Sequence, residues 1–216
     1  MKKQFKTICS RAPLRLSLAG GGTDVSPYYN NYGGVVLNAT IDKYAYTVVK
    51  PSIKGLIKFK SIDKNLEEIF DPNNNVNKPL KLKLHSCAYI HMMKHYNNNN
   101  YVPLKITTYC DAPIGSGLGS SSTIVVSIIK ALAKFLKLSF DQYKIANIAY
   151  LVERKDCKLK GGRQDHYAAA FGGINLIKFY KNDKVKVNKV TVKDHIISQL
   201  ETSFLLYFTG ISRNSE

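Results

Sequence analysis

The chain has 216 residues and a mass of 24.2 kDa, with 44% hydrophobic and 22% charged residues. This length provides one hydrophobic core, or one domain and part of a second, and the composition excludes a disordered tail or a fibre. No apolar run is long enough to span a bilayer, and no apolar stretch follows the basic N-terminus as it would in a secretory signal. We therefore expect a cytoplasmic protein that does not act in a membrane.

The net charge is +17, from 32 basic and 15 acidic residues. Such a charge permits nucleic-acid binding. Only five of the basic residues are arginines, however, and most of the lysines occur singly, whereas recognition of phosphates and bases usually relies on arginine. We interpret the charge as a solvated, lysine-rich surface, and a basic nucleic-acid-binding protein remains the less favoured alternative. The four cysteines form no CxxC pair, which indicates reduced thiols rather than disulfides or a zinc cluster.

In the first half of the chain, an apolar stretch at 11–19 ends at three consecutive glycines. Residues rich in Val, Ile, Thr and Tyr then predict strands, and an apolar stripe with a spacing of three to four residues predicts a helix. We expect strands at 33–50, 55–62 and 102–110, a loop at 71–79 and a helix at 80–96.

The second half contains the strongest helix prediction, at 120–136, because it is apolar on most sides. Ser139 to Gln142 resemble a capping box, so a second helix should start there and run to about Arg154. Further strands are expected at 174–180, 185–192 and 203–209. This irregular mixture of strands and helices predicts an α+β fold with a mixed α/β sheet rather than a regular βαβ winding.

The most informative segment is Pro113 to Ser122 (PIGSGLGSSS), which lies between a predicted strand and the apolar helix. Three alternating glycines allow a tight turn and close approach of the backbone to a ligand. The serines lie at the helix N-terminus, where free N–H groups and the helix dipole favour an anion such as phosphate. The segment is not a P-loop, since no lysine starts the helix. It matches a dinucleotide loop only weakly, because Asp141 sits at a helix cap rather than at a strand end.

The segment PIGSGLGSSS resembles the second motif of the GHMP kinases. Arg11 to Asp24 (RAPLRLSLAGGGTD) resembles the first motif of the same family, and the Gly-Gly-Gly-Thr-Asp version is most similar to that of the heptose 7-phosphate kinases and fucokinases. The resemblance implies a GHMP kinase N-terminal domain of the ribosomal protein S5 domain 2-like type at 1–178. It also implies the start of an incomplete, ferredoxin-like C-terminal domain at 179–216.

The resemblance further implies an ATP-dependent, Mg²⁺-requiring sugar kinase, with a sugar phosphate and ATP as its small-molecule partners. It places the ATP phosphates on the glycine-rich loop, formed by Pro113, Gly115, Ser116, Gly117, Leu118, Gly119, Ser120, Ser121 and Ser122. Ser121 and Glu153 would hold Mg²⁺, which prefers hard oxygen ligands. Asp165, in a segment similar to the family's Gly-x-x-Asp-Gln-Tyr with His166 in place of Gln, would orient the attacking hydroxyl, and Arg15 would lie near the transferred phosphate.

For the acceptor, the resemblance implies that Gly21, Gly22, Thr23 and Asp24 contact the sugar. If the sugar already carries a phosphate, a cation must receive it, and we consider Arg163 or Lys43. His85, His91 and His95 invite a metal hypothesis, but no HExxH is present, so we expect no metal there.

The family's third glycine-rich motif does not follow before the chain stops. We therefore interpret the chain as C-terminally truncated. The alternative to an active kinase is a relative of weak or no activity that only binds ATP or the sugar.

Overall fold

A computed structural model describes residues 6–52, 55–72, 80–112, 115–205 and 207. Its seven-stranded sheet is mixed, because β3 and β5 run parallel while the other neighbouring strands are antiparallel. The strands follow the order β4-β3-β5-β2-β6-β7, and β1 pairs with β2. They are β1 (Ile8–Ala19), β2 (Gly34–Pro51), β3 (Ile57–Ser61), β4 (Leu66–Phe70), β5 (Leu104–Cys110), β6 (Ile174–Phe179) and β7 (Val185–Lys189).

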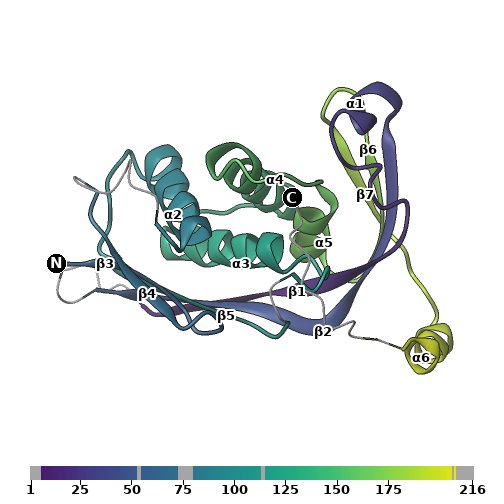
Figure 1. Ribbon diagram of the computed structural model, residues 1–216, viewed down its shortest axis with the longest axis horizontal. Coiled ribbons are helices and arrows are strands. Elements are labelled where there is room, and N and C mark those ends of the chain that lie inside the picture. Colours follow the sequence, from purple (N-terminus) through teal and green to yellow (C-terminus); the bar gives the residue numbers. More distant parts are fainter. Residues whose placement is uncertain (1–5, 53–54, 73–79, 113–114, 206, 208–216) are drawn as a thin grey trace.

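The helices lie mostly on one side of this sheet, so the prediction of a mixed α/β architecture is confirmed (Figure 1). They are α1 (Tyr28–Tyr32), α2 (Lys83–Tyr96), α3 (Ser120–Phe135), α4 (Gln142–Leu151), a π-helical turn (Val152–Asp156), α5 (Gln164–Phe171) and α6 (Asp194–Ser203). The helices predicted at 80–96 and 120–136 correspond to α2 and α3. The strands predicted at 33–50, 55–62, 102–110 and 174–180 correspond to β2, β3, β5 and β6.

The 18-residue strand β2 is the centre of the sheet. It pairs with β1 along most of its length, with β6 through residues 34–39, and with β5 through residues 45–51. Val, Ile, Thr and Tyr make up half of its residues, and such side chains suit a pleated, half-buried surface. Figure 1 shows β1 and β2 bending together, so that β6, β7 and α1 rise at one end of the molecule.

The core lies between the sheet and the helices, with α3 at its centre. Thirteen of the sixteen residues of α3 are buried, which explains why its sequence is apolar on most sides. On the sheet, Leu14, Val36 and Ile106 are fully buried in the same core. At the buried face of β2, the hydroxyl groups of Thr47 and Ser127 lie 2.6 Å apart and satisfy one another. This packing fixes the N-terminus of α3, and with it the glycine-rich loop, relative to β1.

The predicted start of the second helix is wrong by two residues. The helix begins at Gln142, and the carboxylate of Asp141, rather than the hydroxyl of Ser139, accepts the N–H of Lys144 at 2.7 Å. Asp141 has the extended backbone of an N-cap residue, and its carboxylate is as good an acceptor as a hydroxyl. The helix also ends at Leu151 and continues as the π-helical turn, instead of running on regularly to Arg154.

The C-terminal part departs further from the sequence-based expectations. The strand expected at 185–192 ends at Lys189, and Ser203, expected in a strand, is the last residue of α6. Part of the strand expected at 203–209 lies outside the described residues. No residue of α6 is buried, and α6 stands apart from the rest of the molecule (Figure 1). The domain boundary proposed after residue 178 remains a prediction, and β7 pairs with β6 across it.

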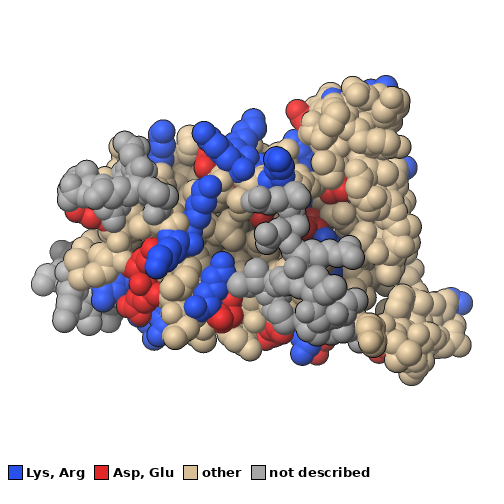
Figure 2. Space-filling view, in the orientation of Figure 1, with Lys and Arg blue, Asp and Glu red and all other residues tan. Residues whose placement is uncertain are grey.

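The surface agrees with the interpretation of a spread, lysine-rich charge. Figure 2 shows Lys and Arg side chains across this face, with Asp and Glu side chains among them. One such mixed group lies on β3, β4 and β5, where Glu67 is within 4 Å of Lys58, Lys60 and Lys105. Exposed pairs of this kind contribute little to stability.

Candidate active site

The glycine-rich loop reaches α3 through backbone conformations that favour glycine. Gly115, Gly117 and Gly119 have φ angles of 78°, 74° and 75°, and α3 begins at the next residue, Ser120. Pro113, the first residue assigned to ATP binding, lies outside the described residues. The loop is tied to β1, because the N–H of Arg15 donates to the carbonyl of Leu118 at 3.2 Å. The start of α3 thus presents its free N–H groups beside β1, as a phosphate site requires.

Arg15 and Asp165 form an ion pair at the same loop, although 150 residues separate them in sequence. Nε and Nη2 of Arg15 both lie 2.6 Å from Oδ1 of Asp165, and Nη1 donates to the carbonyl of Gly117 at 2.8 Å. The two side chains are 12% and 19% exposed, so they are held in place yet remain accessible. The residues predicted to orient the hydroxyl and to lie near the transferred phosphate are therefore in direct contact with each other and with the loop.

Gly119 faces Asp165 so closely that a side chain there would disturb the pair. A Cβ atom at Gly119 would lie 3.0 Å from Cγ of Asp165, whereas a Cβ at Gly117 would meet nothing within 4 Å. Both glycines have positive φ, which costs an L-residue about 1–2 kcal/mol. We expect Gly117→Ala to lose about this much stability and Gly119→Ala to lose more. Urea unfolding of both variants tests this, and equal losses would contradict the close approach.

Glu153, on the π-helical turn, accepts three hydrogen bonds and forms one longer ion pair, although only 1% of its side chain is exposed. Ser121 Oγ donates to Oε1 at 2.7 Å and Ser122 Oγ donates to Oε2 at 2.6 Å. Nε2 of His166 lies 2.6 Å from Oε2, and Nη1 of Arg154 lies 3.6 Å from Oε1. Burial alone would raise the pKa of Glu153, but the hydrogen bond and charge of His166, the charge of Arg154 and the bond from Ser122 lower it to about 2. The carboxylate is therefore ionised throughout the physiological pH range.

The pairing of Ser121 with Glu153 suits the chemistry of Mg²⁺. An ionised carboxylate and a hydroxyl, 2.7 Å apart at the N-terminus of α3, supply two hard oxygens next to the proposed phosphate loop. Magnesium sites usually take their remaining ligands from substrate phosphates and water. Within the described residues, no group of three or more His, Cys, Asp or Glu side chains could hold a metal. The residues present thus fit a cation that arrives with ATP rather than a metal cage made by protein alone.

Sequence reasoning missed three residues of this cluster: Ser122 as a partner of Glu153, His166 and Arg154. The available signal for His166 was its position, since it replaces Gln directly after Asp165 in the family-like segment. His166 links the Arg15–Asp165 pair to the Ser121–Glu153 pair, because it directly follows Asp165 in sequence and contacts Glu153.

Asp24, assigned to the sugar, is 1% exposed, and both of its oxygens are engaged. Oδ2 accepts the N–H groups of Arg163 and Gln164, each at 2.8 Å, and Oδ1 accepts Nε2 of Gln164 at 3.3 Å. These contacts place Asp24 at the start of α5, next to Asp165. Its proposed contact with a sugar remains a prediction.

Arg163, considered as a receptor for an acceptor phosphate, already has partners. Its guanidinium lies between the rings of Tyr29 and Tyr150, at 4.8 and 4.3 Å, and Nη2 is 3.0 Å from Oδ1 of Asp183. The hydroxyl of Tyr29 donates to the same oxygen at 2.9 Å. Burial and this hydrogen bond raise the pKa of Tyr29 to about 12, which keeps the donor protonated. Lys43, the other candidate cation, is exposed on β2.

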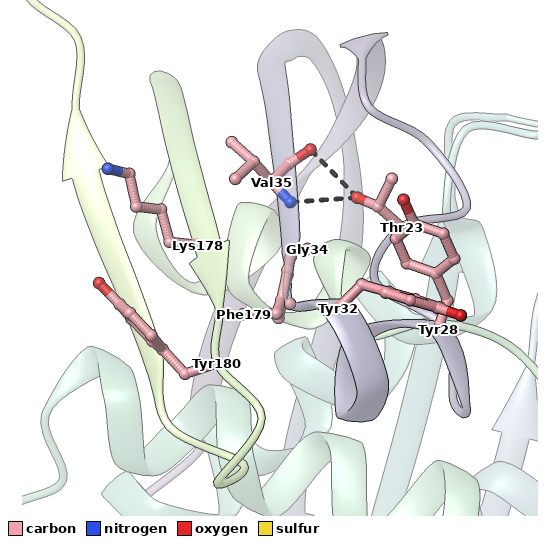
Figure 3. A pocket seen from close by; sticks show the side chains of 9 residues that line it. Thr23, Tyr28, Tyr32, Gly34, Val35, Lys178, Phe179 and Tyr180 are labelled. Atoms are coloured by element: carbon pink, nitrogen blue, oxygen red, sulfur yellow. Dashed lines mark hydrogen bonds between the residues drawn. The ribbon is translucent and has the colours of Figure 1, made fainter.

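Gly21, Gly22 and Thr23 lie in the turn between β1 and α1, where Thr23 borders a shallow hollow of about 440 Å³. Figure 3 shows Tyr28 and Tyr32 near Thr23, and Lys178 and Tyr180 across the hollow. The Thr23 hydroxyl donates to the carbonyl of Gly20 at 2.7 Å and accepts the N–H of Val35 at 3.1 Å. Val35 and Lys178 are paired and exposed, while Val36 and Ile177 beside them are buried. The hollow, which Tyr28 and Tyr32 of α1 also line, therefore opens on the face of β2 and β6 opposite the buried core.

The three histidines considered for a metal have other partners. Nε2 of His85 lies 2.8 Å from the Thr108 hydroxyl, and burial lowers the pKa of His85 to about 4, so it is neutral. Nδ1 of His91 lies 2.7 Å from Oδ2 of Asp156, and its ring lies 4.5 Å from that of His95.

The sequence model of the GHMP kinases N terminal domain matches residues 83–173, which contain the glycine-rich loop, Glu153 and Asp165. This chain contains a GHMP kinase N-terminal domain. It is 43% identical over 212 residues to a D-glycero-alpha-D-manno-heptose 7-phosphate kinase of Campylobacter jejuni, and the match covers 98% of this chain and 62% of that relative. It is 27% identical over 236 residues to an L-fucokinase/L-fucose-1-P guanylyltransferase of Bacteroides fragilis, and this match covers 97% of this chain and 24% of that protein.

Among solved structures, a D-glycero-D-manno-heptose 1-phosphate kinase of Bacteroides thetaiotaomicron superposes with a TM-score of 0.82 at 43% identity. That match covers 91% of this chain and 64% of the other chain. This GHMP chain thus spans less than two thirds of the heptose kinases that it matches. In the part of the chain that the structure describes, no helix is both long and apolar enough to cross a membrane.

Proposed function

We propose that this GHMP chain is the ATP-binding part of a sugar kinase that transfers the γ-phosphate of ATP to a hydroxyl of D-glycero-D-manno-heptose 7-phosphate, the anomeric one. The proposal rests mainly on one observation. The glycine-rich loop, Arg15 and Asp165 are in contact with one another, and Gly119 lies against the Asp165 carboxylate. Phosphoryl transfer depends mainly on positioning and on stabilisation of charge, and this arrangement provides both. The names of the similar heptose kinases support the sugar class.

In this proposal the loop from Gly115 to Ser122 holds the ATP phosphates with its N–H groups and serine hydroxyls. Asp165 orients the acceptor hydroxyl and takes its proton as the oxygen attacks the γ-phosphate. A new P–O bond forms, the bond to the β-phosphate breaks, and ADP leaves. Arg15 holds the carboxylate in that orientation and offers positive charge to the transferred group. Ser121 and Glu153 hold Mg²⁺, which supplies a cation for the charge that develops on the phosphate oxygens.

The proposal predicts that ATP is consumed with heptose 7-phosphate much faster than with the heptose that lacks the phosphate. The reason is that a phosphorylated acceptor gains a charge-assisted contact with a basic protein, and such contacts are stronger than neutral ones. Coupled assays with the two sugars, with and without Mg²⁺, provide the measurement. Equal rates with both sugars would argue against recognition of that phosphate.

The alternative is a relative that binds ATP or the sugar without turnover. Because this chain spans 62% of the Campylobacter relative, the same assay should include a version extended to the full family length. ATP turnover by the extended version alone would show that the remaining third is needed for catalysis. Binding of ATP without turnover by either version would favour the alternative. The third hypothesis, nucleic-acid binding, predicts salt-dependent retention on DNA or RNA.

A further inference from the structure

Asp24 is a buried carboxylate whose partners come from the other end of the domain. Its oxygens accept the N–H groups of Arg163 and Gln164, which are 139 and 140 residues away in sequence. These two amides belong to the start of α5, where the N–H groups of a helix have no partner within the helix. Arg163 itself makes no side-chain cap there. Asp24 therefore supplies the cap of α5 from outside, with a negative charge where the helix dipole favours one.

The approach of Asp24 to this segment requires a glycine at 162. A Cβ atom at Gly162 would overlap both carboxylate oxygens of Asp24. The reason is the close packing of the carboxylate rather than the backbone conformation, since Gly162 does not have a positive φ. Of the two glycines before Asp165, Gly162 is therefore the one that the close packing of Asp24 requires.

The segment that leads into α5 is also held from its other side. Nη1 of Arg154 donates to the carbonyl of Lys160 at 2.8 Å, and Nε donates to that of Gly162 at 3.3 Å. The side chain of Arg163 is held between Tyr29 and Tyr150. Asp24 is the partner that engages the backbone at the two residues directly before Asp165.

We propose that Asp24 is a positioning residue: by binding the backbone amides of Arg163 and Gln164 it sets the first turn of α5, so that Asp165 meets Arg15 and Gly119. This proposal rests on the proposed function in one respect, the role given to Asp165. It differs from the role implied for Asp24 by the family resemblance. A sugar-binding carboxylate needs an accessible oxygen for the sugar hydroxyls, whereas that of Asp24 is 1% exposed and engaged on both oxygens.

Two substitutions separate the roles. In Asp24→Asn the amide oxygen can still accept both N–H groups. Its NH₂ would face Nε2 of Gln164, and a turn of the Gln164 amide would bring Oε1, which is buried without a hydrogen-bond partner, into the accepting position. In Asp24→Ala both amides lose their acceptor. We expect Asp24→Ala to lower kcat by about 100-fold, the cost of a misplacement on the order of 1 Å. Asp24→Asn should restore most of that loss. Asp42→Asn, at an exposed position of β2, is the matched control and should resemble the wild type.

Three readouts decide the result. In Asp24→Ala, hydrogen exchange at the amides of Arg163 and Gln164 should accelerate, and the NMR signal of the Arg15 Nε–H, which donates to Asp165, should shift. The Kd of heptose 7-phosphate, measured calorimetrically without ATP, should stay within about threefold, since each tenfold change needs 1.4 kcal/mol of binding. Gly162→Ala should reproduce the exchange and NMR changes while it retains Asp24, and should be non-additive with Asp24→Ala.

A loss of sugar affinity in Asp24→Ala with unchanged exchange and an unchanged Arg15 signal would overturn the proposal and assign Asp24 to the sugar. The exchange and NMR measurements need no turnover. If neither this chain nor a version extended to the full family length consumes ATP with any sugar, the proposed function fails, and these two measurements still decide whether Asp24 positions Asp165.

Discussion

Replacing Asp165 by Asn should abolish most phosphoryl transfer and leave ATP binding intact. Asn has the same shape, but it lacks the charge that pairs with Arg15 and it cannot take up the proton of the attacking hydroxyl. Groups that act on protons in this way contribute about 10²–10⁴-fold to rate, so we expect kcat to fall by that factor. The glycine-rich loop, which carries the proposed phosphate contacts, keeps its tie to β1 through the backbone of Arg15.

Steady-state ATP consumption and calorimetric ATP binding provide the two measurements for Asp165→Asn. The exposed Asp42→Asn is again the control, because it makes the same chemical change on a strand. Near-normal turnover by Asp165→Asn would refute the assigned role. A large loss of ATP affinity would show instead that Asp165 helps to hold the nucleotide.

Glu153→Gln should cost the largest amount of stability of any single carboxylate in the site. The pKa of Glu153 lies at about 2 in the folded protein, compared with the ordinary value of 4.5. A carboxyl with a lowered pKa contributes stability above its unfolded value, and this contribution is lost as the pH falls from about 4.5 towards 2. Each pKa unit corresponds to 1.36 kcal/mol, so the contribution near neutral pH is about 3 kcal/mol.

Chemical unfolding between pH 7 and pH 3 tests the prediction for Glu153. The wild type should lose stability steeply below pH 4.5, whereas Glu153→Gln should be less stable at pH 7 and show a shallower acid dependence. Glu67→Gln is the contrasting control. Glu67 also pairs with cations, but its side chain is 37% exposed, so solvent screens its ion pairs. Identical pH profiles for wild type and Glu153→Gln would contradict the burial and bonding of this carboxylate.

Local patterns allowed much of the fold to be predicted. The loop from Gly115 to Gly119 and the apolar helix α3 are features of consecutive residues, and periodicity is enough to identify them. The expected mixed sheet is confirmed, as are most of its strands. By contrast, α1, α5 and α6 were not predicted. Helices α1 and α5 have only five and eight residues, which is too few for a clear periodic pattern. In α6 the apolar residues Ile196, Ile197 and Leu200 do follow a helical spacing, and this signal was overlooked.

The residues of the site also fall into two groups: those that local sequence motifs predicted, and those that only the three-dimensional structure brings together. Ser121, Glu153, Arg15 and Asp165 were proposed from family-like motifs, and the structure brings them together in two adjacent clusters, while their roles remain predictions. The link between the clusters, His166 to Glu153, was not predicted. The caps that Asp24 provides to α5 were not predicted either. Each of these depends on the three-dimensional approach of segments that no spacing rule relates, such as Asp24 and Gln164.

Strand β2 runs through both ends of the molecule and pairs with a different strand at each end. At a rise of about 3.4 Å per residue, its 18 residues extend roughly 60 Å, and they carry β5 near one end and β6 near the other. Neither end can melt without removing hydrogen-bond partners from a strand on which the other depends. Loss of order around α1 and β6 should therefore propagate to β5 and β3, and the domain should denature as a single cooperative unit.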